Sequence, residues 1–393
     1  MLLTFPEHKI RIETERFGPF VFQLGTDFSS VEALLLRVSD AHDRFRGSPL
    51  AQVANRLERE VVVTSIFGTN SIEGGTLSEE ETQLALDLDP AKVQDVEQRR
   101  AINLKAAYDI SRQAAADPDW CLNTDFICRI HAAITDNIPH DRNRPGLLRD
   151  NSKEIITYVG DTAHGGRYKP PQYGADIRLL LEQLVEWNHA LKEQGTPAII
   201  RAPLVHYYYE LIHPFWDGNG RVGRVIEATL LQTEGSRYAP FAQARYYFDN
   251  INQYFTLFNL CRKAEAKKTS NPNTPFVQFF LEGMLSSLNK LHDRVNKLIN
   301  LILFENDLKH RHDEKRINVR QYAIVSQLLE AGKPVPMNVL RNAPWYKALY
   351  AQRTDKTKQR DLRQLREEGL IIVDSKNRLW PGIFLPDEEV GER

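Results

Sequence analysis

The segment from His213 to Arg224, with the sequence HPFWDGNGRVGR, constrains this chain more than any other stretch. An apolar run from Val205 to Ile212 is typical of a helix, and it ends directly before His213. A loop with two glycines follows and leads into a second helix. Glycines let a backbone approach a ligand closely, and the free N–H groups of a helix N-terminus bind anions. The segment therefore predicts two helices joined by an anion-binding loop.

The side chains of this segment fit the chemistry of phosphate esters. Arg221 and Arg224 lie three positions apart, so both guanidinium groups can reach phosphate oxygens from one helical face. Asp217 supplies a hard oxygen ligand where a magnesium ion bridging phosphates would sit. His213 is the group best suited to accept a proton near neutral pH. Together they predict a nucleotide-using transferase. The alternative, a glycine-rich turn that caps a structural helix, needs neither the phased arginines nor the aspartate.

The pattern H-x-F-x-[D/E]-G-N-G-R-x-x-R is similar to the signature of the Fic family, and all eight constrained positions are present. The resemblance implies a mainly α fold, a Fic-type helical bundle with a β-hairpin flap. It implies an enzyme, a protein adenylyltransferase that moves AMP from ATP to a hydroxyl side chain of a target protein. His213 would be the catalytic base and Asp217 the Mg²⁺ ligand. The expected ATP-binding residues are Gly218, Asn219, Gly220, Arg221, Val222, Gly223 and Arg224, the last of which would reach the γ-phosphate.

An upstream segment, Thr69 to Gly74 (TNSIEG), resembles the inhibitory helix [S/T]-x-x-x-E-[G/N] of many Fic proteins. The resemblance implies that Glu73 pairs with Arg224 and blocks productive placement of the γ-phosphate. The local chemistry agrees, because residues 52–72 have the pattern of a helix that Gly74 and Gly75 would terminate. Ser78 and Glu81 form a capping box for the next helix. The alternative is that Glu73 is an ordinary solvated residue near a helix end.

Two further segments resemble parts of the family site. Residues 155–159 are β-branched and aromatic, and a glycine-rich turn separates them from residues 165–169, which predicts a hairpin. The resemblance implies a flap that holds the target segment by strand addition; a surface hairpin without catalytic use is the alternative, and His164 in its turn is expected to be solvated. Asn250 matches by spacing a family asparagine that touches the nucleotide base or ribose. The residues after it, Ile251 and Asn252, depart from the pattern of many relatives and put the register in doubt.

The C-terminal region has a different pattern. Helices are expected at 319–331, near 337–342 and at 354–368, followed by strands at 370–373 and 378–380, which resembles a winged helix with the third helix in the recognition position. From Arg353 to Arg366 there are six basic and two acidic residues, a net charge of +4. This charge permits contact with DNA phosphates. A packing, dimer or partner module is an equal alternative, so a homodimer stays open.

Helical spacing predicts the rest of the fold. Apolar residues recur at helical spacing in residues 28–60, 91–117 and 120–137, and the buried stripe of the last is expected at Phe126, Ile127, Ile130 and Ile134. His131 and His206 are expected to be hydrogen-bonded core histidines. Pro203 either begins the helix that leads to the motif or kinks it. A chain of 393 residues is too long for one typical core. The predicted domains are an N-terminal helical region with the inhibitory helix (1–118), a Fic domain (119–265), connecting helices (266–316) and a winged helix (317–388).

Composition narrows the class of protein. The 51 Lys and Arg residues nearly balance the 52 Asp and Glu residues, so no global field favours nucleic acid or membrane. The three cysteines lack metal-ligand spacing, and no apolar stretch approaches the ~20 residues that span a bilayer. No secretion signal is visible at the N-terminus, and a cytoplasmic location is expected.

The sequence thus leads to one main prediction and two alternatives. The main prediction is an ATP- and Mg²⁺-dependent protein adenylyltransferase, inhibited by Glu73 and able to modify itself, whose target protein the sequence does not reveal. The first alternative is a DNA-binding regulatory protein in which the Fic domain senses a nucleotide. The second is an enzyme that removes AMP from modified targets.

Overall fold

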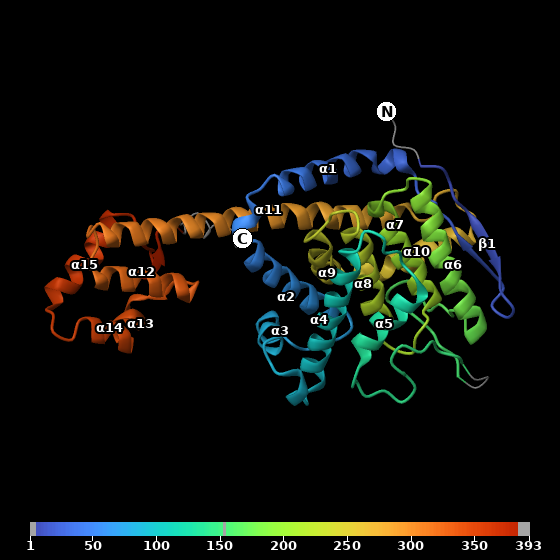
Figure 1. Cartoon of the computed structure of the whole chain (residues 1–393), viewed down its shortest axis with the longest axis horizontal. Coiled ribbons are helices and arrows are strands. Elements are labelled where there is room, and N and C mark those ends of the chain that lie inside the picture. Colours follow the sequence, from blue (N-terminus) through green and yellow to red (C-terminus); the bar gives the residue numbers. More distant parts are fainter. Residues whose placement is uncertain (1–4, 152–154, 384–393) are drawn as a thin grey trace. The chain divides into compact units, whose positions relative to one another are not determined.

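The computed structural model describes residues 5–151 and 155–383, and it is mainly helical, as predicted (Figure 1). The chain divides into two compact units, residues 1–293 and 294–393. The boundary lies inside helix α11, so the predicted segment 266–316 contributes to both units. The elements that begin in the first unit are β1 (Ile10–Glu13), β2 (Pro19–Phe22), α1 (Phe28–Arg46), η1 (Leu50–Gln52), α2 (Ala54–Ile72), α3 (Glu79–Ala85), η2 (Pro90–Lys92), α4 (Val96–Ala115), α5 (Thr124–Thr135), α6 (Gly174–Glu193), α7 (Ala198–Ile212), α8 (Asn219–Gln232), α9 (Ala239–Asp249), α10 (Ile251–Ala266) and α11 (Thr274–Asp313).

The N-terminal hairpin was not predicted from the sequence. Strands β1 and β2 pair antiparallel, and Ile10 lies opposite Phe22. The buried carboxylate of Asp176, in the first turn of α6, accepts hydrogen bonds from the backbone N–H groups of Glu15, Arg16 and Phe17 at 2.9–3.0 Å. These bonds satisfy the backbone N–H groups in the turn of the hairpin and attach the turn to α6. This attachment explains how so short a pair of strands is stabilised.

The inhibitory-helix segment folds as predicted, although the region before it does not form one continuous helix. Helix α1 ends at Arg46, and Pro49 precedes a short 3₁₀ turn before α2 begins at Ala54. Helix α2 ends at Ile72, and Gly74 adopts a positive φ of 82°, which a glycine accommodates without strain. The capping box of Ser78 and Glu81 then opens α3. Glu73 is therefore the last residue before a sharp turn.

Helices α4 and α5 occupy the places that the apolar spacing indicated. Asp95 caps α4 through the N–H of Gln98, and Asn123 caps α5 through the N–H of Phe126. The predicted stripe of α5 is confirmed, since all four of its residues are buried: Phe126, Ile127, Ile130 and Ile134.

The two helices of the motif form the centre of the first unit. Helix α7 is buried on almost every side, as expected for a helix that is apolar all round. It begins at Ala198, so Pro203 lies inside the helix and does not start it. Helix α8 packs directly against α7, and the contact depends on Gly223. A Cβ atom there would lie 2.8 Å from Oε1 of Glu210 and 2.8 Å from Cδ2 of His206, so only glycine allows this approach.

The predicted hairpin of residues 155–169 is reduced to one antiparallel bridge between Val159 and Tyr168. Side chains take the place of a partner strand for the residues before it. The amide of Gln172 accepts the N–H of Thr157 at 2.7 Å, and Asn151 donates to the carbonyl of Ile155 at 3.1 Å. Local side-chain bonds of this kind compete with strand pairing. Residues 152–154, which precede this segment, lie outside the described part of the chain.

The second unit agrees with the predicted order of elements and adds a strand and a helix to it. Its elements after α11 are α12 (Val319–Ala331), β3 (Val335–Pro336), α13 (Met337–Asn342), α14 (Pro344–Leu349), α15 (Asp355–Glu367), β4 (Ile371–Val373) and β5 (Arg378–Pro381). The strand order is β3-β5-β4, with both pairs antiparallel. The buried Asp361 joins α15 to α12, because it accepts hydrogen bonds from Arg320 and from the hydroxyl of Tyr350 at 2.9 Å each. Residues 384–388 of the predicted domain lie outside the described residues.

Within residues 5–151 and 155–383, no helix is both long and apolar enough to cross a membrane. The cytoplasmic location stays a prediction from the sequence.

Candidate active site

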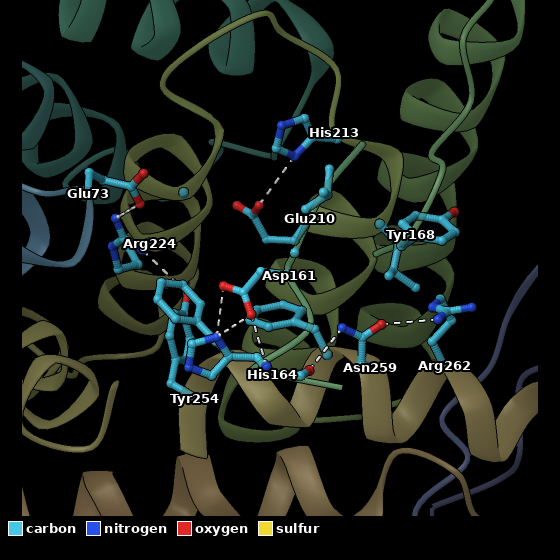
Figure 2. A pocket seen from close by; sticks show the side chains of 16 residues that line it. Glu73, Asp161, His164, Tyr168, Glu210, His213, Arg224, Tyr254, Asn259 and Arg262 are labelled. Carbon is cyan, nitrogen blue, oxygen red and sulfur yellow. Dashed lines mark hydrogen bonds and ion pairs between the residues drawn. The ribbon is translucent and has the colours of Figure 1, made fainter. Parts of the chain in front are cut away.

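A cavity of about 330 Å³ opens beside the junction of α7 and α8, within the size range of small-molecule sites (Figure 2). Four of the predicted site residues line it: His213, Gly220, Arg224 and Glu73. The remaining wall comes from the end of α7, from α10 and from the segment around the Val159–Tyr168 bridge. These lining residues are Val159, Gly160, Asp161, His164, Tyr168, Glu210, Leu211, Tyr254, Phe255, Phe258, Asn259 and Arg262.

His213 is held in a strained backbone conformation at the C-terminus of α7. Its φ of 51° and ψ of 61° are left-handed, which costs a non-glycine residue on the order of 1 kcal/mol or more. The buried Arg149 stabilises this turn, since its Nε donates to the carbonyl of His213 at 2.6 Å and its backbone N–H donates to Pro214 at 3.0 Å. Burial lowers the pKa of Arg149 to about 10, and its side chain bonds to carbonyl and amide oxygens. Arg149 therefore fixes the backbone of His213, from which the imidazole projects.

Arg224 is the most buried cation of the cavity and is paired with Glu73. Its Nη2 donates to Oε1 of Glu73 at 2.6 Å and to the carbonyl of Thr69 at 3.2 Å. Burial opposes the charge of Arg224, but the Glu73 carboxylate and the Tyr254 hydroxyl together raise its pKa, so the guanidinium stays charged. The same carboxylate lies over the N-terminus of α8. A Cβ on Gly220 would be 2.1 Å from Oε1 of Glu73, so the glycine leaves room for this carboxylate in its paired position.

A chain of buried hydrogen bonds extends from Arg224 into the core. Arg224 Nη1 donates to the hydroxyl of Tyr254 at 3.3 Å, and that hydroxyl lies 3.1 Å from Nε2 of His206. Nδ1 of His206 is 2.7 Å from the carboxylate of Glu227, so it carries the proton and Nε2 accepts from Tyr254. Tyr247 also donates to Glu227. His206 is thus the hydrogen-bonded core histidine that the sequence predicted, and it supports Arg224 from behind.

The loop between the two motif helices is fixed by its own side chains. The Asn219 amide accepts the N–H of Phe215 at 3.0 Å and donates to its carbonyl at 2.8 Å. Phe215 stacks on His131 with ring centroids 3.7 Å apart, and His131 is hydrogen-bonded to Asp217 and to the N–H of Gly146. Burial lowers the pKa of His131 to about 4, so it is neutral. His131 is therefore a core residue, as predicted, and it holds the loop through the ring of Phe215 and the backbone carbonyl of Asp217.

Asp217 and Arg221 form a second ion pair beside this loop. Nη2 of Arg221 donates to Oδ2 of Asp217 at 3.0 Å. Burial by itself would raise the pKa of Asp217, but the charge of Arg221 together with hydrogen bonds from Gly218 and Arg221 lowers it overall. Among the described residues, no three His, Cys, Asp or Glu side chains gather to hold a metal ion. A lone ionised carboxylate nevertheless fits Mg²⁺, which takes one or two carboxylates and otherwise substrate phosphates and water.

Several predicted ATP ligands do not line the cavity. The predicted ligands outside its wall are Asp217, Gly218, Asn219, Arg221, Val222 and Gly223. Val222 is fully buried, and Gly223 faces α7, so both have packing roles. Asn250 lies at the break between α9 and α10, where its amide donates to the carbonyl of Tyr246 at 2.9 Å. The family register therefore does not bring Asn250 to this cavity, whereas Asn259 of the following helix lines it.

The segment around the Val159–Tyr168 bridge lines the cavity and is bound to α10 by side chains of that helix. Asn259 donates to the carbonyls of His164 and Gly166 at 3.1 and 2.7 Å, and Arg262 lies over the ring of Tyr168 at 5.0 Å. His164 was expected to be solvated, which is wrong. Its Nδ1 is 2.9 Å from Asp161 and its Nε2 is 3.1 Å from Asn252, and these bonds raise its pKa. His164 therefore links the segment around the Val159–Tyr168 bridge to α10, to which Asn252 belongs.

Sequence reasoning missed Arg149, Glu210 and Tyr254. Arg149 lies 64 positions before its His213 contact and carries no local signal. Glu210 and Tyr254 lie in or beside segments that were recognised, and helical spacing could have placed Glu210 near His213, three positions later.

Comparisons with known proteins agree with this geometry. Residues 121–231 match the model of the Fic/DOC family. Protein adenylyltransferase fic-1 of Caenorhabditis elegans is 23% identical over 297 residues, which cover 74% of this chain and 53% of that protein. Protein adenylyltransferase Fic of Drosophila yakuba is 24% identical over 283 residues, covering 70% and 52%. The chain thus spans about half the length of the curated relatives it matches.

Solved structures share the fold. A Fic domain containing signaling protein from Bacteroides thetaiotaomicron superposes with a TM-score of 0.54 at 19% identity, covering 66% of this chain and 97% of that chain. A Fic family protein from Desulfovibrio desulfuricans gives 0.55 at 17% identity and covers 90% and 95%. The prediction of a mainly α, Fic-type fold is confirmed.

Proposed function

We propose that this Fic family protein is a protein adenylyltransferase, that it transfers AMP from ATP to a hydroxyl side chain of a target protein, and that Glu73 restrains this activity. The observation that carries the proposal is the Glu73–Arg224 pair, whose 2.6 Å bond lies in the same cavity as His213. The proposed base, His213, and the proposed phosphate-binding cation, Arg224, line one cavity, and the carboxylate of Glu73 forms an ion pair with that cation.

Unsatisfied donors support an anionic ligand at α8. Nε of Arg221 and Nε of Arg224 are buried and have no hydrogen-bond partner among the described residues. Buried polar atoms are nearly always partnered, so an orphaned donor calls for an explanation. Phosphate oxygens would satisfy both arginines, and the N-terminus of α8 would add its backbone dipole. Arg224 would hold the γ-phosphate once Glu73 releases it.

The reaction needs one proton transfer and one displacement. Nε2 of His213 would take the proton of the target hydroxyl, and the hydroxyl oxygen would form a bond to the α-phosphorus. The bond between that phosphorus and the oxygen bridging to the β-phosphate would break, and pyrophosphate would leave with the electron pair. The protein contributes orientation and charge stabilisation, which are the main terms in phosphoryl-type transfers. Asp217 would hold the Mg²⁺ ion, which when bound neutralises phosphate charge.

The second unit is proposed to be a winged helix, with α15 as the helix that would meet DNA. The supporting observation is charge, because Lys356 and Arg360 are exposed and form no ion pair with a described residue. This makes DNA binding a second candidate function, and a nucleotide-sensing regulator is the form it would take. A cytoplasmic location and self-modification belong to the main proposal, the protein adenylyltransferase.

Incubation of the whole chain with α-labelled ATP and Mg²⁺ tests the main proposal. Wild-type protein should label weakly, and Glu73→Gly should label itself or an added target protein more strongly. Glu73→Gln is the matched control, since it keeps the volume of the side chain and removes its charge; it should also be activated. Protein labelled beforehand and then mixed with the wild type would reveal the reverse reaction by loss of label. No label in any variant would favour the regulatory alternative.

A further inference from the structure

The end of α7 places a second titratable side chain against the imidazole of His213. Nδ1 of His213 lies 3.7 Å from Oε2 of Glu210, and both side chains line the cavity (Figure 2). This separation is an ion-pair distance, longer than a hydrogen bond. Catalytic hydrogen bonds are often long in proteins without substrate and shorten when it binds. The geometry is that of a base and its orienting carboxylate.

Both partners are otherwise uncommitted. Nδ1 of His213 and Oε1 of Glu210 are buried and form no hydrogen bond with any described residue. A buried carboxylate without a donor is costly, and so is a buried ring nitrogen without a partner. Oε2 of the same Glu210 carboxylate is the oxygen that lies 3.7 Å from Nδ1 of His213. Nδ1 can carry a proton and donate it in a hydrogen bond, and the carboxylate can accept that bond.

The remaining acidic side chains of the cavity have partners elsewhere. Glu73 accepts from Arg224 at 2.6 Å, and Asp161 lies 2.9 Å from the imidazole of His164. Glu210 is therefore the one carboxylate among the described lining residues without a hydrogen bond, and His213 is the cation-forming group beside it. The packing of α8 against α7 also fixes this carboxylate, since a Cβ on Gly223 would lie 2.8 Å from Oε1 of Glu210.

We infer that Glu210 is a positioning residue for the base, which accepts a hydrogen bond from Nδ1–H of His213 and leaves Nε2 free to take the proton of the target hydroxyl. The tautomer of a histidine is set by the bond that its other nitrogen makes. When Nε2 takes the proton, the imidazolium gains a carboxylate neighbour, while the phosphorus–oxygen exchange and the loss of pyrophosphate proceed as above. This inference rests on the proposed function for its reaction, but the tautomer exists without any reaction.

The first experiment reads the tautomer. Wild-type protein labelled with ¹⁵N-histidine is compared with His213→Ala to assign the ring signals of His213. A predominantly Nδ1–H form is expected in the wild type. In Glu210→Leu, which keeps a similar volume and removes the acceptor, this form should give way to a mixture of both tautomers. Glu210→Asp should retain a larger share of it. An Nε2–H form in the wild type, or an unchanged spectrum in Glu210→Leu, would overturn the inference.

The second experiment reads turnover in the Glu73→Gly background. Glu210→Leu should lower kcat by about 10- to 1,000-fold and leave KM for ATP within about threefold, because orientation of a base acts on the chemical step. Glu210→Asp should recover part of the loss. The control is Glu234→Gln, which removes another carboxylate that binds α7, at the N–H of Ala198 and at Arg201. It should lower Tm and leave both kcat and the His213 tautomer unchanged.

The two proposals fail in different ways. If Glu73→Gly shows no transfer at all while His213 carries its proton on Nδ1, the proposed function is wrong and the pairing stands. If Glu73→Gly is active and Glu210→Leu matches it within twofold, the transferase stands and Glu210 has no part in it. A rise of KM for ATP with unchanged kcat would also count against the inference, since it would assign Glu210 to nucleotide binding.

Discussion

Arg224 of α8 and Lys358 of α15 each pair with a carboxylate at close range, 2.6 Å to Glu73 and 2.9 Å to Asp355. Their surroundings differ. The Arg224 side chain is 2% exposed and that of Glu73 32%, whereas the values for Lys358 and Asp355 are 35% and 88%. Water and salt screen the second pair, and exposed pairs contribute about 0–1 kcal/mol. The first pair lies in a cavity beside orphaned donors, where phosphate would replace the carboxylate under the proposed function. The two pairs differ in burial far more than in distance, and we therefore expect only the buried pair to affect AMP transfer.

Removal of the proposed base, His213, should have the largest effect on AMP transfer. It would show that the cavity of the first unit carries the activity. His213→Ala in the Glu73→Gly background should lower AMP transfer by about 10²–10⁴-fold, because it removes the imidazole that would take the proton of the target hydroxyl. ATP affinity and Tm should stay near those of the parent, since Arg224 and the α8 N-terminus are untouched. Near-normal turnover in a folded variant would assign the base to another group.

The Glu73–Arg224 pair itself gives the next largest effect. Its coupling should be about 1–3 kcal/mol, so Glu73→Gly should raise transfer by roughly 5- to 150-fold. Arg224→Ala should lower transfer through loss of the γ-phosphate contact, and the double variant should resemble Arg224→Ala because the inhibition acts through that arginine. The exposed pair supplies the control. Lys358→Ala should leave the rate unchanged, and an unchanged rate in Glu73→Gly would show that the upstream match is chance.

The sequence predicted the parts of the site that depend on local patterns. The motif predicted that Arg221 and Arg224 lie in one helix, and both lie in α8. The capping box of Ser78 and Glu81 and the turn at Gly74 after α2 were also predicted. Contacts between distant segments were beyond its reach. Nothing local indicated that Arg149 binds the carbonyl of His213, or that Tyr254 links Arg224 to the core.

Two expectations changed for identifiable physical reasons. Asn250 was placed by spacing from the motif, but it lies between α9 and α10 with its amide on the carbonyl of Tyr246, and the asparagine that lines the cavity is Asn259. The contact of Asn250 with the nucleotide stays a prediction. The paired strands expected near residues 155–169 shrank to one bridge because the side chains of Asn151 and Gln172 bind the backbone that would have paired. In both places side chains form hydrogen bonds to the backbone, which periodicity does not encode.

A smaller effect is expected from the chain of bonds behind Arg224. Tyr254→Phe removes the hydroxyl that lies 3.3 Å from Arg224 and 3.1 Å from His206. A hydrogen bond of about 1 kcal/mol corresponds to a roughly fivefold rise in KM for ATP, with a smaller change in kcat. Tyr247→Phe is the matched control, because Tyr247 binds Glu227 and does not touch Arg224. Equal KM values for the two variants would show that the chain does not position Arg224.

The pH dependence of the cavity mouth should be weaker still. Hydrogen bonds with Asn252 and Asp161 raise the pKa of His164 above its ordinary value of 6.5. A raised pKa stabilises the folded contact fully below pH ~6.5, and this contribution is lost as pH rises through the folded pKa. Amide exchange at Val159 and Tyr168, corrected for the intrinsic rate, should therefore speed up modestly on going to higher pH. In His164→Gln this pH dependence should vanish; its persistence would assign it to another group.

Substitutions on α15 should have no effect on AMP transfer. The role of its exposed charges is therefore tested by DNA binding alone. Lys356 and Arg360 lie four positions apart, exposed and without an ion-pair partner among the described residues, while Lys358 is paired with Asp355. If α15 contacts phosphates, Lys356→Ala with Arg360→Ala should weaken binding to any duplex and flatten the plot of log K against log salt by about 2. Lys358→Ala should flatten it by less, since its charge is already partly neutralised. Salt titrations of the intact protein with a labelled duplex provide the slopes. Absence of salt-sensitive binding in the wild type would assign the second unit to protein contacts, and equal slopes for the two sets of variants would contradict the role given to Asp355.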